Sequence, residues 1–328
     1  MISRRRLIGL SAASALAPGT LRRTALAQEQ SWPNRFVRMI VPYAPGGPTD
    51  VIARVVADRL AQIWGQQVVI ENRGGGGGNI AAEVVARSDP DGYTMFMSGA
   101  SLAVNRNFYR TLSYDPIADF APVTLICSFS LFMFVPNSSP AKSVKEFIAH
   151  AQRNKGKLTF ASPGAGTAPH LCAELFRQTA GLEMTHVPYR GAGPAMNDLI
   201  PGRVDLLFSG GATYQYAKSG QVRALGVTGA KRIPSAPDVP TIAEAALPGF
   251  EVSSWFAFFV PTRTPPDIVR KMNADCVAAL ADPAVKGRLE QIGYDVASSS
   301  PEELAYLLKA EIDRWGVVIK RAGIETKP

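Results

Sequence analysis

The sequence of 328 residues predicts an α/β protein in which helices cover parallel sheets. Two observations predict this class. Apolar strand-like runs alternate with helical runs over residues 36–98, and again over about 128–250. In addition, an apolar strand, a loop of small residues and a helix start occur together at residues 39–50 and again at residues 160–176. At this length two domains are expected rather than one.

The first 27 residues have the composition of a targeting signal. The twin-arginine pattern Ser3-Arg4-Arg5-Arg6-Leu7-Ile8 leads into a weakly apolar run, and Ala25-Leu26-Ala27 offers a small-x-small cleavage site. The apolar run is too short to span a bilayer, which takes about 20 residues. We expect residues 1–27 to be a twin-arginine signal peptide cleaved near Ala27, and the protein to be exported to the periplasm.

The formal net charge of +8 is mostly a property of this leader. The leader contains no acidic residue, and subtracting its five arginines from +8 leaves +3 for the rest of the chain; they are Arg4, Arg5, Arg6, Arg22 and Arg23. No cluster of Lys and Arg with interleaved aromatic residues remains. We therefore expect no nucleic-acid partner.

The first series of elements is interrupted by a run of five glycines, Gly74 to Gly78. No Lys-Ser/Thr follows, and the G-x-G-x-x-G frame fails at Asn79 and Ile80. We therefore expect a flexible or tightly turning loop rather than a phosphate site. Around it, periodicity predicts a strand at 36–41, a helix at 50–64, a strand at 68–71, a helix at 79–87, a turn at 88–93 with Gly92 at positive φ, and a strand at 94–98.

The second series resembles the first in its order of elements. The pattern predicts a helix at 143–151, a strand at 157–161, a helix through 169–176, a strand ending at 186–189, a short helix at 195–200, and strands at 204–209 and 222–228. The chain then returns through a strand at 255–260 to helices at 267–281, 283–291 and 301–322. Ser300-Pro301-Glu302-Glu303 predicts a capping box at the start of the last helix.

Two of the loops predict an anion site. Pro45-Gly46-Gly47-Pro48-Thr49 and Pro163-Gly164-Ala165-Gly166-Thr167 both join a strand to a helix, and we interpret both as Thr-capped helix starts. A helix N-terminus presents unpaired N–H donors and a partial positive charge. Small residues let the backbone approach a ligand closely. Two such termini facing one cleft would bind an anion without Lys or Arg.

The sequence argues against an exported enzyme and against a nucleotide-binding protein. The stretch Gly99-Ala100-Ser101-Leu102-Ala103 lacks the closing glycine of a nucleophile elbow, and no nucleophile, base and orienting residue stand out. His150 and His186 have no metal-like spacing, so we expect neither a metal nor a cofactor. We interpret Cys127, Cys172 and Cys276 as buried apolar residues, and their spacing leaves open whether two of them pair.

Several motifs follow one another along nearly the whole chain after the leader: Val41-Pro42-Tyr43-x-Pro45-Gly46-Gly47-x-x-Asp50-x-x-Ala53-Arg54, Glu71-Asn72-Arg73, Pro90-Asp91-Gly92-Tyr93-Thr94, Pro163-Gly164-x-Gly166-Thr167-x-x-His170-Leu171, Val187-Pro188-Tyr189-x-Gly191 and Phe259-Val260-Pro261. Together they resemble the motifs of the Bug family, the extracytoplasmic solute-binding subunits of tripartite tricarboxylate transporters.

This resemblance implies a type II periplasmic-binding-protein fold, with two α/β domains and a ligand cleft between them. Domain 1 would combine residues 33–127 with 252–328, and domain 2 would comprise 128–251. The implied function is capture of a small di- or tricarboxylate, or of an aromatic carboxylate, and its delivery to the integral membrane permease subunits of the transporter. We expect a monomer. A ligand-sensing co-receptor of the same fold is the alternative.

The resemblance also implies which residues bind the ligand. Asp50 either complements the helix dipole or reaches the ligand through water, and His170 either binds or only packs. Arg190 either reaches a distal carboxylate or lies in solvent. Trp255 and Phe256 are further candidates for the cleft wall. The implied ligand-binding residues are Tyr43, Ala44, Gly46, Gly47, Thr49 and Asp50 in the first loop, Ser162, Gly164, Gly166, Thr167 and His170 in the second, and Tyr189 and Gly191 beside it.

Overall fold

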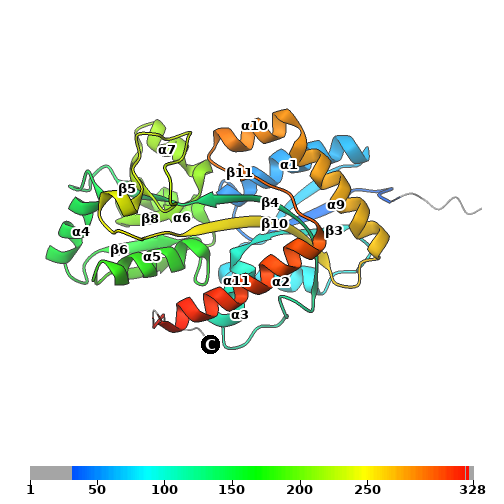
Figure 1. The fold of residues 1–328 in the computed structure, drawn as a ribbon, viewed down its shortest axis with the longest axis horizontal. Helices are drawn as coiled ribbons and strands as arrows, with labels where there is room; N and C mark the ends of the chain where they lie inside the picture. Colours follow the sequence, from blue (N-terminus) through cyan, green and yellow to red (C-terminus); the bar gives the residue numbers. More distant parts are fainter. Residues whose placement is uncertain (1–31, 322, 325–328) are drawn as a thin grey trace, which may run out of the picture. The chain divides into compact units, whose positions relative to one another are not determined.

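The computed structural model describes residues 32–321 and 323–324. The predicted signal peptide therefore lies outside the described residues. Within them the chain forms one six-stranded and one five-stranded sheet, each packed among helices (Figure 1). This arrangement confirms the predicted α/β class.

The six-stranded sheet is built around a parallel centre. Strand β1 pairs in parallel with β2 and with β3, as the strand-helix-strand order predicts. Strand β10 lies antiparallel between β3 and β4, so the sheet is mixed rather than wholly parallel. The strand order is β11-β4-β10-β3-β1-β2, with bounds β1 Val37–Val41, β2 Val68–Asn72, β3 Thr94–Gly99, β4 Phe120–Ser130, β10 Ser253–Pro261 and β11 Asp295–Val296.

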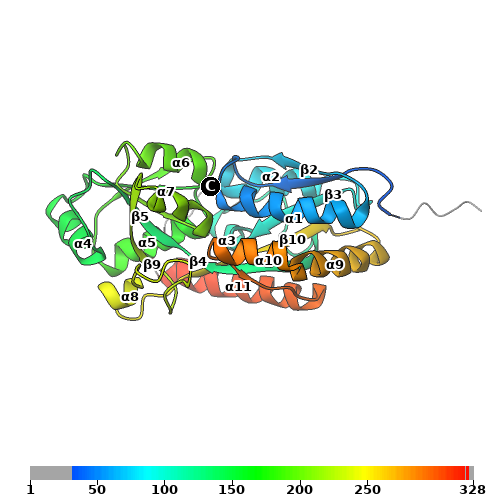
Figure 2. The same cartoon turned by 90° about the horizontal axis from the view of Figure 1, so that it is seen from above.

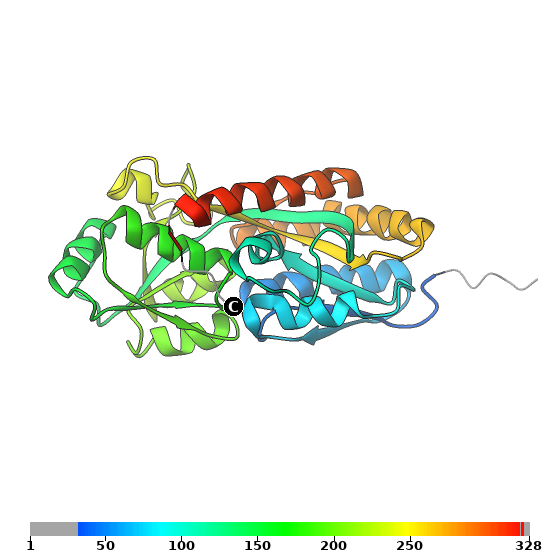
Figure 3. The same ribbon diagram turned by 90° about the horizontal axis from the view of Figure 1, so that it is seen from below.

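The helices of this sheet come from both ends of the chain. Helix α11 packs against α3 and β4, and α9 packs against α1. Helices from the C-terminal part of the chain therefore pack with the N-terminal elements of the six-stranded sheet (Figure 3). The helical elements are α1 Pro48–Trp64, η1 Gly76–Gly78, α2 Asn79–Ala86, α3 Ala100–Phe108, α9 Pro266–Ala281, α10 Pro283–Gln291 and α11 Pro301–Arg321.

The five-stranded sheet has the order β7-β6-β8-β5-β9. Strand β6 pairs in parallel with β7 and β8, while β5 is antiparallel to β8 and β9. The bounds are β5 Phe132–Pro136, β6 Thr159–Ser162, β7 Thr185–Pro188, β8 Leu206–Ser209 and β9 Val222–Val227, with helical elements α4 Val144–Arg153, α5 Ala168–Thr179, α6 Ala192–Leu199, η2 Gly211–Tyr214, α7 Gln215–Lys218 and α8 Ile242–Ala245 (Figure 2).

Thr228 forms hydrogen bonds to both of the segments in which the chain passes from one sheet to the other. The β4–β5 crossing passes through Leu131, and the β9–β10 crossing returns through Val252. The Thr228 hydroxyl accepts a hydrogen bond from Leu131 N–H at 2.9 Å and donates one to the Val252 carbonyl at 2.6 Å. The backbone of Thr228 adds one hydrogen bond to each residue. Because all three residues are buried, water does not compete for these bonds.

Several predicted details are confirmed, and some helices differ from the prediction. Ser300 and Glu303 exchange both capping-box hydrogen bonds, and Gly92 has a φ of +82°. Helix α3 was not predicted. Helix α1 begins at Pro48 rather than residue 50, since Pro suits the first turn, and α6 begins at Ala192 rather than residue 195.

The three cysteines are buried and unpaired, with Cys172 in α5 and Cys276 in α9. Burial raises the pKa of each thiol, so the thiols stay protonated and pack as small apolar groups. Within residues 32–321 and 323–324, none of the helices combines the length and apolar character that crossing a bilayer requires.

Candidate functional site

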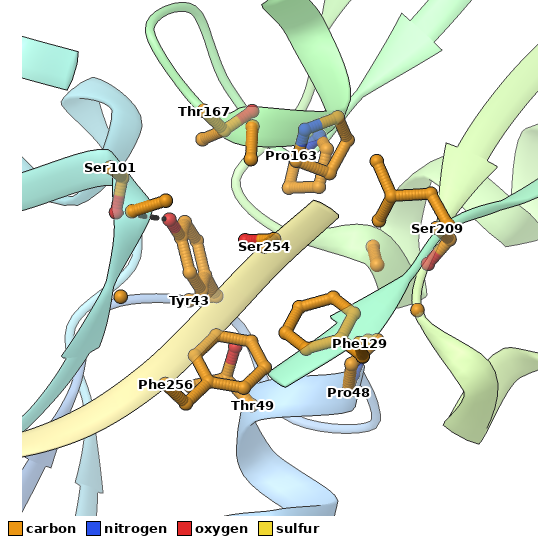
Figure 4. Close-up of a pocket in the computed structure, with 18 residues that line it drawn as sticks. Tyr43, Pro48, Thr49, Ser101, Phe129, Pro163, Thr167, Ser209, Ser254 and Phe256 are labelled. Carbon is orange, nitrogen blue, oxygen red and sulfur yellow. Dashed lines mark hydrogen bonds between the residues drawn. The ribbon is translucent and has the colours of Figure 1, made fainter. Parts of the chain in front are cut away.

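A pocket lies where β1, β3, β6 and β8 end, in agreement with the rule that α/β sheets bind ligands beyond the carboxyl ends of their parallel strands. It encloses about 500 Å³ of space between atoms, open solvent included. Residues associated with both sheets line it, together with the strands that cross between them (Figure 4).

Helix α1 begins at this pocket. Gly47 is its N-cap residue, and Gly47, Pro48 and Thr49 all line the pocket. The prediction that Thr49 caps the helix is wrong, because the helix starts at Pro48 and leaves Thr49 inside its first turn without a side-chain cap. The first N–H groups of a helix have no intrahelical partner, so those of this turn are available to a ligand.

Helix α5 presents the matching helix start. Thr167 is its N-cap residue, as predicted, and its hydroxyl accepts a hydrogen bond from His170 N–H at 3.4 Å. The same hydroxyl donates to the Gly164 carbonyl at 2.7 Å, which folds the preceding loop tightly. Thr167, Ala168 and Pro169 line the pocket.

Two further helices begin at the same place. Gly99, Ala100 and Ser101, at the start of α3, line the pocket, and so does Ala192, the first residue of α6. The starts of four helices therefore converge on one pocket. Because each carries a partial positive charge, their fields add at the point where they meet.

None of the described residues that line the pocket has a charged side chain. The polar groups on its wall are hydroxyls, together with the backbone of the helix starts. Tyr43 donates a hydrogen bond to Ser101 Oγ at 3.0 Å. Burial raises the pKa of Tyr43 to about 12, so its phenol is neutral at physiological pH. The arrangement suits an anion held by dipoles and N–H groups.

The crossing strands contribute Phe129, Leu131, Ser254 and Phe256 to the wall. The rings of Phe129 in β4 and Phe256 in β10 are stacked, with centroids 4.8 Å apart (Figure 4). Alternation along β10 explains why Trp255 does not join Phe256 at the pocket: it faces the other side and donates its indole N–H to buried Glu311. A ligand therefore meets an aromatic surface as well as the helix starts.

Of the predicted ligand-binding residues, Tyr43, Gly47, Thr49 and Thr167 line the pocket. The other predicted residues of the first loop, Ala44, Gly46 and Asp50, lie outside the pocket lining and form hydrogen bonds that hold the loop in place. Ala44 N–H donates to the Arg190 carbonyl at 2.9 Å, and Gly46 N–H donates to Asp50 at 3.1 Å. Burial by itself would raise the pKa of Asp50, but hydrogen bonds from Arg54, Gly46 and Asn72 outweigh it and lower that pKa below its ordinary value.

The second-loop residues outside the pocket lining form their own network. The Ser162 hydroxyl contacts His186 Nε2 at 2.7 Å and accepts from Gly164 N–H at 3.1 Å. The His170 ring accepts a hydrogen bond from Gly166 N–H at 3.3 Å and packs 4.1 Å from the His186 ring. These contacts fix the loop that precedes α5.

Tyr189 and Gly191 also lie outside the pocket lining. Tyr189 donates its phenol hydrogen to Asp198 at 2.7 Å, and burial together with this carboxylate raises its pKa to about 12. Gly191 packs on Ala44, where an added Cβ would lie 2.9 Å from the Ala44 nitrogen. Arg190 meets the first loop through its carbonyl and does not line the pocket.

The glycine run, Gly74 to Gly78, lies in close contact with the loops that carry Ala165 and Arg190. Gly75 to Gly78 all have positive φ, so the predicted tight turning is confirmed. A Cβ on Gly77 would collide with the Ala165 carbonyl, and one on Gly74 would lie 2.6 Å from the Arg190 carbonyl. Tyr109 donates its phenol hydrogen to the same Ala165 carbonyl at 3.1 Å. Only glycine permits this approach of backbone to backbone.

Sequence reasoning missed part of the pocket. The start of α3 was considered only as a failed nucleophile elbow, although Gly99 after a strand is also a signal for a helix start at a sheet edge. Polar residues at strand ends were a second available signal. The missed lining residues are Pro48, Gly99, Ala100, Ser101, Phe129, Leu131, Pro163, Ala168, Pro169, Ala192, Ser209, Gly210 and Ser254.

The α/β fold and the pocket built from helix starts are those of a solute-binding protein. The family described as tripartite tricarboxylate transporter family receptor matches residues 52–324, and the chain belongs to it. It is thus a binding receptor and not an enzyme. A relative from Pseudomonas sp. strain P51, a protein encoded between tcbD and tcbE, is 41% identical over 320 residues, which cover 97% of this chain and 94% of the relative.

Solved structures confirm the fold and the resemblance to Bug proteins. The periplasmic binding protein BugD has a TM-score of 0.88 and 36% identity, with 90% of this chain and 100% of BugD covered. A protein of R. palustris solved with adipate has a TM-score of 0.87 and 39% identity, with 90% of this chain and 99% of that protein covered. The type II periplasmic-binding-protein fold is therefore the fold of this chain.

Proposed function

We propose that this receptor captures a small carboxylate in the pocket where α1, α3, α5 and α6 begin. The observation that carries the proposal is the convergence of four helix starts on a pocket whose described lining residues include no charged side chain. A carboxylate supplies the negative charge that these dipoles favour and the acceptors that their N–H groups lack. The similar structure of the R. palustris protein with adipate supports the same ligand class.

Within this site we propose two roles for the residues implied by the sequence. Tyr43, Gly47, Thr49 and Thr167 contact the ligand from the pocket wall. The others hold the loops in the conformation that presents these four: Ala44, Gly46, Asp50, Ser162, Gly164, Gly166, His170, Tyr189 and Gly191.

We further propose that the protein works in the periplasm as a monomer and delivers its ligand to the permease subunits of a tripartite tricarboxylate transporter. The family description and the twin-arginine sequence with its cleavage site near Ala27 support this role. Residues 33–127 with 252–328 would form one domain and 128–251 the other. The inter-loop contacts at Ala44 and Ala165 would form as the two domains close on the ligand.

A thermal-shift screen tests the proposal. Purified protein is heated with mono-, di- and tricarboxylates, aromatic carboxylates, the matching amides, sugars and nucleotides. A ligand at about 100 times its Kd adds about 2.7 kcal/mol to the free energy of unfolding, which for a domain of this size raises Tm by about 5 °C or more. We expect such a shift with at least one carboxylate and none with its amide. Shifts with sugars or nucleotides, and none with any acid, would overturn the proposal.

A further inference from the structure

Ser209 brings an unpaired hydroxyl to the pocket. It is the last residue of β8, is only 1% exposed and lines the pocket. Its Oγ is closed off from solvent and has no hydrogen-bond partner among the described residues. Two other hydroxyls of the wall are engaged: that of Ser101 accepts from Tyr43, and that of Thr167 bonds to Gly164 and His170.

A buried hydroxyl without a partner is a rare and unfavourable feature of a folded protein. None of the described residues places a partner within hydrogen-bonding distance of the Ser209 Oγ. The next residue, Gly210, is so closely packed that an added Cβ would lie 2.7 Å from the Tyr294 hydroxyl and 3.2 Å from the Phe129 ring. The Tyr294 hydroxyl itself accepts from Ala212 N–H. A ligand atom in the pocket is the partner that would satisfy Ser209.

The position of Ser209 indicates which part of a ligand it meets. Figure 4 shows Ser209 across the pocket from the Tyr43 and Ser101 pair, with the apolar side chains of Phe129, Phe256 and Pro163 between them. A molecule that spans this distance meets a hydroxyl group at each end and mainly apolar side chains along its length, together with the Ser254 hydroxyl. With one end held beside Tyr43 and Ser101 at the start of α3, the other end reaches Ser209.

We propose that Ser209 is a specificity-determining residue, whose hydroxyl donates a hydrogen bond to an acceptor at the ligand end remote from the carboxylate held beside Tyr43 and Ser101. This inference rests on the proposed function and narrows it. The favoured ligands are unbranched carboxylates with a second acceptor at the far end, above all a second carboxylate. Acids that end in a methyl group leave Ser209 unpaired and bind more weakly.

Isothermal titration with acids that differ only in their end group tests this role. For each chain length from four to eight carbons, the α,ω-dicarboxylate is compared with the ω-hydroxy acid and the plain alkanoate. At the best length we expect the dicarboxylate to bind at least tenfold more tightly than the alkanoate. In Ser209→Ala we expect a loss of about tenfold for the dicarboxylate, equal to about 1.4 kcal/mol, and a change of less than about twofold for the alkanoate.

The matched control is Ser219→Ala, which removes a hydroxyl that bonds to the Tyr216 carbonyl on the exposed surface. It should leave every affinity unchanged. Equal losses for the dicarboxylate and the alkanoate in Ser209→Ala, or no loss for either, would overturn the role of Ser209. If Ser209→Ala does not fold, the absence of any end-group preference in the wild-type protein would overturn it. Failure of the proposed function looks different, because then no acid of any kind binds.

Discussion

Asp50 shows how one buried carboxylate orders the first loop. Its side chain is 5% exposed and pairs with Arg54 at 2.9 Å. It also accepts from Gly46 N–H, and Asn72 links it to the Tyr43 carbonyl. The charge of Asp50 is therefore balanced inside the protein rather than directed at the ligand. This is why an acidic residue lies next to a site proposed for anions.

We expect Asp50→Asn to lower the free energy of unfolding by about 1–2 kcal/mol at pH 7, because a charged acceptor of buried hydrogen bonds is lost. The folded-state pKa of Asp50 is below its ordinary value of 3.8. The stabilisation is therefore fully present above about pH 4 and is lost as pH falls through the folded-state pKa. Urea unfolding of both proteins at pH 7 and pH 3 should show a difference that shrinks in acid.

Glu83→Gln is the control for Asp50→Asn. Glu83 also pairs with an arginine four residues later, Arg87, at 2.7 Å, but its side chain is 37% exposed. Exposed pairs of this kind contribute about 0–1 kcal/mol. An equal loss of stability in the two variants would show that burial of Asp50 is not the source of its effect.

Single residues also show the limits of sequence reasoning. Thr167 could be predicted as an N-cap, because the capping signal is local and the helix pattern starts beside it. Thr49 looked the same in sequence, but Pro48 moved the helix start forward. Ser209 ends an apolar strand, where a polar residue can signal a site, but no local pattern shows that its hydroxyl lacks a hydrogen-bond partner in the fold.

Among the elements, the glycine run has a role that its composition alone does not reveal. Its backbone turns through positive φ at four successive residues and meets the loop before α5 at the Ala165 carbonyl. The sequence predicted the turning, because five glycines favour it. It could not predict the partner, since Gly77 and Ala165 are far apart in the chain and belong to different series of elements.

We expect Gly77→Ala to weaken ligand binding about tenfold or more, because its Cβ would push away the Ala165 carbonyl and with it the loop before α5. Titration with the best ligand of the thermal-shift screen measures this loss. Gly65→Ala is a matched control: Gly65 has a φ of +62°, close to the +64° of Gly77, but has nothing within 4 Å of an added Cβ.

Both variants carry the same backbone strain, of about 1 kcal/mol or more. Gly77→Ala carries in addition the cost of displacing the Ala165 carbonyl, and only this variant should lose affinity. Unchanged affinity in Gly77→Ala would mean that the loops need not approach each other closely for the ligand to be held.

In the whole molecule, the order of the elements was predictable and the way the sheets are joined was not. The local periodicity of apolar residues predicts the alternation of strands and helices. The apolar run at 123–135 carries no mark of where one sheet ends and the other begins. The structure divides it at Leu131, because the backbone of Leu131 bonds to Thr228, 97 residues later. The antiparallel position of β10 likewise depends on partners from distant parts of the chain.

Thr228→Val tests how strongly the two crossings are joined. The substitution keeps the shape of the side chain but leaves Leu131 N–H and the Val252 carbonyl without their hydroxyl partner. We expect the free energy of unfolding to fall by about 2–3 kcal/mol, as measured by urea titration. Thr262→Val, at an exposed threonine, should change it by less than about 0.5 kcal/mol. Equal stability of the two variants would show that the crossings do not depend on this hydroxyl.

The absence of charged side chains from the described pocket wall has a consequence for evolution and for engineering. If the backbone recognises the carboxylate, substitutions cannot easily remove that recognition without harming the fold, and so a family can keep it while its sequences diverge. Differences in ligand between family members would then arise from the few side chains that contact the part of the ligand outside its carboxylate. Redesign of such a receptor as a biosensor for another acid should therefore begin at Phe129, Phe256 and Ser209 and leave the helix starts untouched.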